Sequence, residues 1–207
     1  MPEARLDPRP AVAAGDPHVP RHVVGVVASL GGIAALRRLL AGLPADLPAA
    51  VLVVQHVERR RPSRIAEMLA PSSALPVHEA REGEAMAEGV VYVAPPDRHL
   101  LAGPDGRLVL CDAPPEHWSR PSGDPLFRSI AAHYGPRGVA VVLTGRNSDG
   151  CGGVPEVRAA GGTVLVQDPQ TALDGSMPRA SIRTGAVDQV LSLDDIAPAL
   201  VSAVAAG

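Results

Sequence analysis

The stretch HVVGVVASLGG, residues 22–32, decides the fold class of this chain. Its first seven residues form a short β-branched run typical of a buried strand, and Ser-Leu-Gly-Gly then supplies a tight turn. Apolar residues follow at helical spacing until Gly42 and Pro44 end the pattern: Ile33, Leu36, Leu39, Leu40 and Leu43. Strand, glycine turn and helix in this order are the first unit of a parallel α/β sheet.

The same alternation continues over most of the chain. Further strands are expected at residues 49–55, 77–80, 90–94, 139–144, 163–167 and 187–191. Helices are expected at residues 62–69, 125–134, 154–160, after Pro178, and from Asp194 as its cap to Ala205. Pro104-Asp105-Gly106 separates strands at 99–102 and 107–111 and predicts a hairpin.

The apolar strands are nearly unbroken and lie between amphipathic helices, a pattern that indicates a parallel sheet covered on both faces. The sequence therefore predicts an α/β fold with three α/β/α layers. Its mostly parallel sheet has about seven strands, with an inserted antiparallel hairpin.

The length of 207 residues suits one domain with a buried core. Residues 1–20 are rich in proline and predict a flexible N-terminal arm, which places the domain at residues 21–207. With 2% aromatic residues and a net charge of −3, the chain lacks the features of a nucleic-acid binder. No apolar run reaches the roughly 18 residues of a membrane span, and no signal peptide is evident. We expect a cytoplasmic protein without membrane insertion.

Neither a metal nor an organic cofactor is expected. The two cysteines, Cys111 and Cys151, lie far apart, and the seven histidines show no short ligand spacing. A glycine-rich loop at 145–153 suits a phosphate-binding alternative, but it matches neither G-x-G-x-x-G nor the P-loop pattern.

Three predicted strands end close to residues of a possible nucleophilic site. Ser29 follows the first strand, His56 the second, and Asp149 lies five residues after Thr144. A serine hydroxyl attacks a carbonyl when an imidazole accepts its proton and a carboxylate orients the imidazole. The simpler alternatives are a serine that caps the following helix, a strand-end histidine and a turn aspartate. The absence of G-x-S-x-G and the order Ser, His, Asp disfavour an α/β-hydrolase.

Five collinear motifs then carry a family resemblance: ASLGG (28–32), QHV (55–57), SRPSGDPLF (119–127), LTGRNSDG (143–150) and SMP (176–178). YVAP (92–95) and His99 match as well. From about Val23 to Leu200 the chain resembles the catalytic domain of CheB, the chemotaxis protein-glutamate methylesterase.

The resemblance implies Ser29 as nucleophile, His56 as general base and Asp149 as the carboxylate that orients it. It implies a serine carboxylesterase acting on glutamyl methyl esters of a methylated chemoreceptor or similar sensor, with glutamine deamidation as a second activity. It also implies that the loop containing Arg146 and Asn147 supplies a backbone oxyanion donor, so that the substrate and oxyanion region comprises Leu30, Gly31, Arg146 and Asn147.

The sequence departs from the family pattern in this region. Leu30 stands where the family has threonine, and Arg146 and Asn147 replace methionine and glycine. Arg146 is expected to contact an acidic neighbour in the substrate or to point into solvent. These departures keep open the alternative of a catalytically weakened homologue that binds a receptor or partner. Without a preceding receiver domain, we expect a stand-alone version of the domain.

Two further features have a simpler and a functional interpretation. Arg59-Arg60-Arg61 is expected to form a solvated face or to dock an acidic receptor helix. Cys151 is a rival nucleophile, although a buried thiol is favoured. The remaining candidates are expected to shape the rim of the site or cap a helix, without catalytic roles: His99, Arg120, Ser122 and Asp124.

Overall fold

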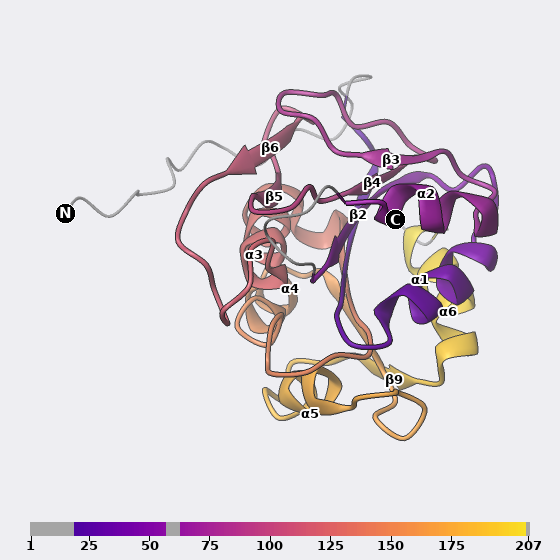
Figure 1. Ribbon diagram of the computed structural model, residues 1–207, viewed down its shortest axis with the longest axis vertical. Coiled ribbons are helices and arrows are strands. Elements are labelled where there is room, and N and C mark those ends of the chain that lie inside the picture. Colours follow the sequence, from indigo (N-terminus) through magenta and orange to yellow (C-terminus); the bar gives the residue numbers. More distant parts are fainter. Residues whose placement is uncertain (1–18, 57–62, 206–207) are drawn as a thin grey trace.

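The computed structural model describes residues 19–56 and 63–205, and its centre is a seven-stranded parallel sheet (Figure 1). The strand order is β3-β4-β2-β1-β7-β8-β9. Its strands are β1 (His22–Ala28), β2 (Ala49–Gln55), β3 (Val77–Glu79), β4 (Val91–Val93), β7 (Gly138–Val142), β8 (Thr163–Gln167) and β9 (Gln189–Leu191).

Helices alternate with these strands along the chain. They are α1 (Gly32–Ala41), α2 (Ile65–Leu69), α3 (Gly123–Tyr134), α4 (Val154–Ala159), α5 (Ser176–Ile182) and α6 (Leu193–Ala205). Two short 3-10 turns are η1 (Ala70–Ser72) and η2 (Gly135–Arg137).

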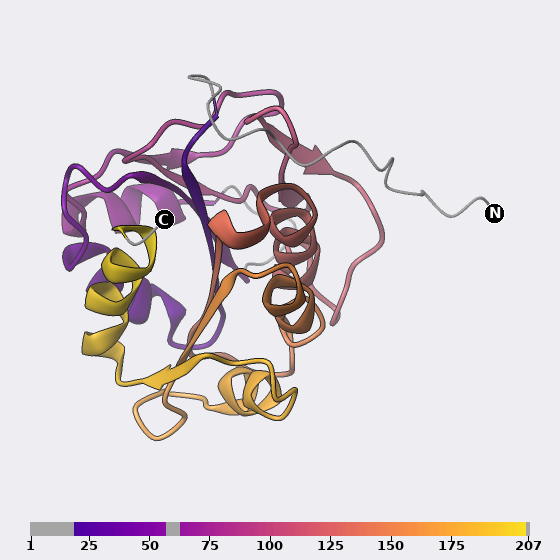
Figure 2. The same ribbon diagram turned by 180° about the vertical axis from the view of Figure 1, so that it is seen from behind.

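The sheet separates two apolar cores. Alternate residues of β1 point to opposite faces, so Val24 and Val26 join one core while Val23 and Val27 join the other. Helices α1, α2 and α6 cover the first face, and α3, α4 and α5 cover the second. Figure 2 shows the sheet between the two groups of helices. Because both faces are buried, the central strands β1 and β2 consist mainly of Val, Ala and Leu.

The predicted hairpin exists as a separate two-stranded antiparallel sheet of β5 (His99–Ala102) and β6 (Leu108–Cys111). It packs on α3, where the amide of Ala102 donates to Ser129 Oγ and the hydroxyl of Tyr134 donates to the carbonyl of Gly103. The three-layer fold, the seven-stranded parallel sheet and the additional hairpin are confirmed.

Three local predictions need correction, and two others lie outside the described residues. Helix α6 begins at Leu193, so Asp194 lies in its first turn and pairs with Arg38 instead of capping the helix. Helix α5 begins two residues before Pro178, because proline fits the first turn, where no amide donor is required. Helix α2 begins at Ile65 and not near Pro62, because Ser63 and Arg64 are not helical and the Ile65 amide donates to the Ser63 hydroxyl at 3.2 Å. The predicted arm up to residue 18 and the arginines at 59–61 fall outside the described part of the chain.

Candidate active site

The carboxyl ends of β1, β2 and β7 meet where the strand order reverses. Strand β1 pairs with β2 on one side and with β7 on the other, so the chain extends the sheet in both directions from β1. In open α/β sheets, ligands bind at such a switch point. Ser29 follows β1, His56 follows β2 and Asp149 lies in the loop after β7, so the topology brings all three together.

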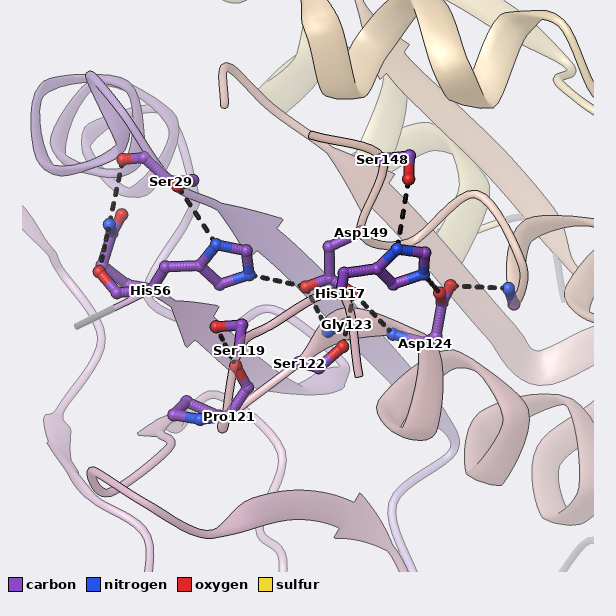
Figure 3. Close-up of polar contacts among 12 residues, drawn as sticks. Ser29, His56, His117, Ser119, Pro121, Ser122, Gly123, Asp124, Ser148 and Asp149 are labelled. Carbon is purple, nitrogen blue, oxygen red and sulfur yellow. Dashed lines mark hydrogen bonds and ion pairs between the residues drawn. The ribbon is translucent and has the colours of Figure 1, made fainter. Parts of the chain in front are cut away.

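A hydrogen-bonded series joins these three side chains (Figure 3). His56 Nδ1 lies 3.1 Å from Ser29 Oγ, and His56 Nε2 lies 2.6 Å from Asp149 Oδ2. A carboxylate accepts hydrogen bonds, so Nε2 carries the proton and Nδ1 presents its lone pair to the serine hydroxyl. The Ser29 side chain does not cap α1, whose N-cap residue is Gly31. The arrangement suits proton transfer from Ser29 to His56.

Asp149 is fully buried and held by four donors. Oδ1 accepts from the Ser122 hydroxyl at 2.5 Å and the Asp124 amide at 3.2 Å; Oδ2 accepts from the Gly123 amide at 2.7 Å and from His56. Burial acts to raise the pKa of Asp149, but hydrogen bonds and the charge of His56, together with Ser122 and Gly123, lower it below the ordinary value. The carboxylate therefore stays ionised and fixed opposite the imidazole.

Two glycines allow the tight turn that carries Ser29. Gly31 has a φ of 81°, and the amide of Gly32 donates to the carbonyl of Ser29 at 2.8 Å. A Cβ on Gly32 would lie 2.0 Å from Gln55 Oε1 and 2.8 Å from the Ala28 Cβ. Gln55 Nε2 in turn donates to the Ser29 carbonyl at 3.0 Å. Gln55, a polar residue at the end of an apolar strand, thus stabilises the serine turn through this hydrogen bond.

The loop after β7 packs directly against this turn. The Ser29 amide donates to the Thr144 carbonyl at 3.0 Å, and Thr144 Oγ1 donates to the Leu30 carbonyl at 2.9 Å. A Cβ on Gly145 would lie 2.8 Å from the Ser29 Cβ. The residues that follow Gly145 are thereby placed beside the serine.

Of the two unusual residues of this loop, Asn147 keeps a glycine-like backbone and Arg146 turns its side chain outward. Asn147 has a φ of 68°, a left-handed conformation that asparagine tolerates better than most residues. The side chain of Arg146 is 72% exposed, and its Nε lies 3.4 Å from Asp174 Oδ2. Arg146 thus contacts an acidic residue of its own chain, where the sequence led us to expect a substrate contact or solvent alone.

A pocket of about 630 Å³ opens beside Ser29 and His56. Leu30, which is 41% exposed, forms an apolar wall of this pocket together with Ile33 and Ala34, and Arg37 adds a positive charge. An acyl group bound here would meet the serine hydroxyl at one end and an apolar surface at the other.

Two of the predicted rim residues fix the loop between β6 and α3. Arg120 bonds to Asp97 through Nε and Nη2, and its Nη1 donates to the carbonyls of Asp112 and Ala113. His99 is buried and its Nε2 lies 3.1 Å from the Pro114 carbonyl; burial lowers its pKa and favours the neutral ring. Both residues support the rim without reaching the Ser29 hydroxyl.

Cys151 is poorly suited to act as a nucleophile. Burial raises the pKa of its thiol, and the nearby charge of Asp124 acts in the same direction. Since the thiolate is the reactive form, the half-buried Cys151 stays protonated at neutral pH.

The sequence did not reveal the donors that hold Asp149, or the role of His117. Two of the four donors are backbone amides, for which a sequence carries no signal, although the SRPSGD motif had drawn attention to Ser122 and Asp124. His117, Asp124 and Asp149 place potential metal-ligand atoms within 4.8 Å of one another. The two carboxylates of this group already accept hydrogen bonds from protein donors.

No helix in the described part of the chain is both long enough and apolar enough to cross a membrane.

Fold and site together define a doubly wound α/β domain with a Ser-His-Asp series at its switch point. Residues 24–200 match the family model described as CheB methylesterase, and the chain belongs to this family. The crystal structure of the Thermotoga maritima CheB methylesterase catalytic domain superimposes with a TM-score of 0.83 at 34% identity, covering 87% of this chain and 97% of that one.

Curated relatives also support membership of this family. A protein-glutamate methylesterase/protein-glutamine glutaminase 3 of Anaeromyxobacter dehalogenans is 47% identical over 200 residues, covering 93% of this chain and 58% of the relative. A protein-glutamate methylesterase/protein-glutamine glutaminase 4 of Myxococcus xanthus is 43% identical, covering 87% of this chain and 51% of the relative. The chain thus spans about half the length of these curated relatives.

Proposed function

We propose that this protein hydrolyses glutamyl methyl esters on a methylated chemoreceptor or similar sensor in the cytoplasm, and that residues 21–207 are its catalytic unit. The observation that carries the proposal is the series from the Ser29 hydroxyl through His56 to the buried Asp149. The names of the relatives, protein-glutamate methylesterase/protein-glutamine glutaminase, supply the substrate class.

In the first step, Ser29 Oγ attacks the ester carbonyl and its proton passes to His56 Nδ1. The resulting imidazolium is stabilised by Asp149, whose lowered pKa keeps it ionised. His56 then returns the proton to the departing oxygen, and methanol leaves as the Ser29 glutamyl ester forms. The bond from Oγ to carbon replaces the bond from carbon to the methoxy oxygen.

The negative oxygen of the tetrahedral intermediate needs hydrogen-bond donors close to Ser29. We assign this task to the backbone amides around Leu30 and Gly31, at the N-terminus of α1, and around Arg146 and Asn147. The packing of Thr144 and Gly145 against the Ser29 turn places the two segments side by side. Because backbone amides serve as donors, the substitutions at positions 30, 146 and 147 are compatible with catalysis.

In the second step, His56 removes a proton from water, which attacks the acyl-serine and releases glutamate and free Ser29. Each cycle adds one negative charge to the receptor. A glutamine side chain presents the same carbonyl with an amide nitrogen in place of the methoxy oxygen. Deamidation therefore follows the same steps, with the carbon–nitrogen bond broken and ammonia released.

The experiment is a comparison of methanol release from methylated receptor membranes by the native chain and by Ser29→Ala, His56→Gln and Asp149→Asn. We expect release by the native chain, and a loss of about 10³-fold or more in the Ser29 and His56 variants. Ser202→Ala, an exposed hydroxyl on α6 remote from the site, is the matched control and keeps full activity.

If the folded native chain releases no more methanol than Ser29→Ala, the esterase proposal is wrong. The alternative of a homologue that binds a receptor or partner with little catalysis then gains support.

A further inference from the structure

A second serine, histidine and aspartate are hydrogen-bonded in series next to the first (Figure 3). His117 lies in the loop between β6 and α3, Asp124 is the second residue of α3, and Ser148 directly precedes Asp149. None of these three belongs to the site proposed above as nucleophile, base or orienting acid. We call them the second relay.

The geometry of the second relay repeats that of the first. His117 Nδ1 lies 3.1 Å from Ser148 Oγ, and His117 Nε2 lies 2.6 Å from Asp124 Oδ2. These distances equal those of His56 to Ser29 and to Asp149. As in the first series, the carboxylate accepts from Nε2, so the lone pair of Nδ1 faces the serine hydroxyl.

The carboxylate of the second relay is also fixed in a buried position. The Asp124 side chain is only 2% exposed, and its Oδ1 accepts a hydrogen bond from the Gly153 amide at 2.8 Å. With one oxygen bound to a backbone amide and the other to His117, the carboxylate orients the imidazole as Asp149 orients His56.

The second imidazole is more accessible than the first. The His117 side chain is 30% exposed, against 14% for His56, and Ser148 is half-buried. Neither His117 nor Ser148 lines the pocket beside Ser29, so an ester at the Ser148 hydroxyl would lie outside that pocket.

Three residues of this region have a left-handed backbone without being glycine. His117 and Trp118 have φ values of 48° and 64°, and Asn147, which precedes Ser148, has a φ of 68°. Non-glycine residues in this conformation cost free energy and persist where the surrounding contacts enforce them, often at functional sites. Here the unfavourable conformation of two separate loops coincides with a direct hydrogen bond between His117 and Ser148.

We propose that Ser148, His117 and Asp124 form a second nucleophilic site, which hydrolyses small activated carboxylic esters independently of Ser29. His117 Nδ1 accepts the proton of the Ser148 hydroxyl while Oγ bonds to the acyl carbon. The carbon bond to the leaving alcohol breaks, and that oxygen takes the proton from His117. Water then attacks the acyl-Ser148 and releases the carboxylic acid. Aryl esters suit this site because their leaving group departs readily.

The test uses the full chain with Ser29→Ala, which removes the proposed primary nucleophile, and p-nitrophenyl acetate as substrate. We expect this variant to release p-nitrophenol at least about tenfold faster than Ser29→Ala/Ser148→Ala. Acid quenching and peptide mass mapping should find the acetyl group on Ser148. In Ser29→Ala/His117→Gln the release falls to the rate of the Ser148 double variant, because the glutamine amide keeps hydrogen-bonding capacity but accepts no proton.

Ser29→Ala/Ser119→Ala is the matched control, since Ser119 lies in the loop of His117 but donates to the Pro121 carbonyl outside the second relay. This control should release p-nitrophenol at the same rate as Ser29→Ala. The proposal is overturned if Ser148 carries no acetyl group in folded Ser29→Ala, or if acetylation of Ser148 is unchanged by His117→Gln. Either result would leave the second relay as a tether between two loops. The mapping on Ser29→Ala alone decides the matter even if a double variant does not fold.

Discussion

The hydroxyl of Ser122 lies 2.5 Å from Oδ1 of Asp149, inside the protein and out of contact with solvent. A buried carboxylate is stable only when its lone pairs are satisfied, and Ser122 supplies one of the four donors that do this. The position of Asp149 opposite His56 thus depends on a residue that never contacts the imidazole.

Ser122→Ala is expected to lower kcat for receptor demethylation about tenfold with little change in KM, because the carboxylate loses one anchor. The free energy of unfolding should fall by about 1.5–3 kcal/mol, the usual contribution of a hydrogen bond to a charged group. Steady-state kinetics and denaturant titration measure the two effects. Ser129→Ala, which removes another buried hydroxyl on α3, should lower stability and leave kcat unchanged. An unaltered kcat in Ser122→Ala would contradict the prediction.

Gly32→Ala is expected to lower kcat about 100-fold, because the new methyl group displaces Gln55 and the Ser29 carbonyl loses its hydrogen bond. Methanol release measures the effect. Gly83→Ala is the control, since its Cβ meets nothing within 4 Å and its cost comes from the backbone strain of a φ of 72° alone. Gly83→Ala should lose stability but keep activity; equal kcat values for both variants would refute the argument.

Asp149 and Asp124 should affect stability in opposite directions as pH changes. The pKa of Asp149 is lowered on folding, so its contribution is present above the unfolded value of about 3.9 and is lost as pH falls through the lower folded value. The difference in unfolding free energy between the native protein and Asp149→Asn should therefore shrink below about pH 4.

Burial raises the pKa of Asp124, and the nearby charge of Asp149 adds to this, against hydrogen bonds from Gly153 and His117. The folded state then holds the Asp124 proton more tightly than the unfolded state, so stability falls as pH rises from about 3.9 through the folded value. The native protein should lose stability relative to Asp124→Asn over that interval. Denaturant titrations from pH 3 to 8, with exposed Asp46→Asn as control, test both carboxylates. If the difference in unfolding free energy from the native protein changed with pH in the same direction for Asp149→Asn and Asp124→Asn, the prediction would be wrong.

Asn147 should tolerate glycine but not alanine. Asn147→Gly keeps the left-handed φ of 68° at no steric cost, so kcat should stay within about twofold of the native value. Asn147→Ala should lower the free energy of unfolding by about 1–2 kcal/mol and reduce kcat, because the loop beside Ser29 must adjust. Steady-state kinetics and thermal unfolding measure both effects. Equal kcat and equal stability in the two variants would mean that the left-handed conformation at position 147 affects neither.

Much of the fold was predictable because buried strands and amphipathic helices leave periodic apolar patterns. The HVVGVVA run and the glycines after it located β1, the turn and α1 to within about two residues. The placement of Ser29, His56 and Asp149 at one edge was predictable, since the carboxyl ends of parallel strands share an edge, whereas the strand order itself came from the structure.

Contacts that depend on loop conformation were not predictable. The partner of Asp194 is Arg38, which is far away in sequence, and a cap was the better local interpretation. The contact between His117 and Ser148 joins two loops whose backbones include left-handed residues, and neither residue type nor spacing indicates it. The amide donors to Asp149 belong to the backbone and have no counterpart in a motif of side chains.

The strand order also divides the molecule into two halves that each lack a complete site. The N-terminal half, with β1 to β6, contains Ser29 and His56, and the C-terminal half, from α3 onward, contains Asp149. Activity can therefore appear only after β7 has docked on β1. Two fragments divided in the loop before α3 would be inactive apart and active on reassociation, so recovered hydrolysis would report fragment complementation.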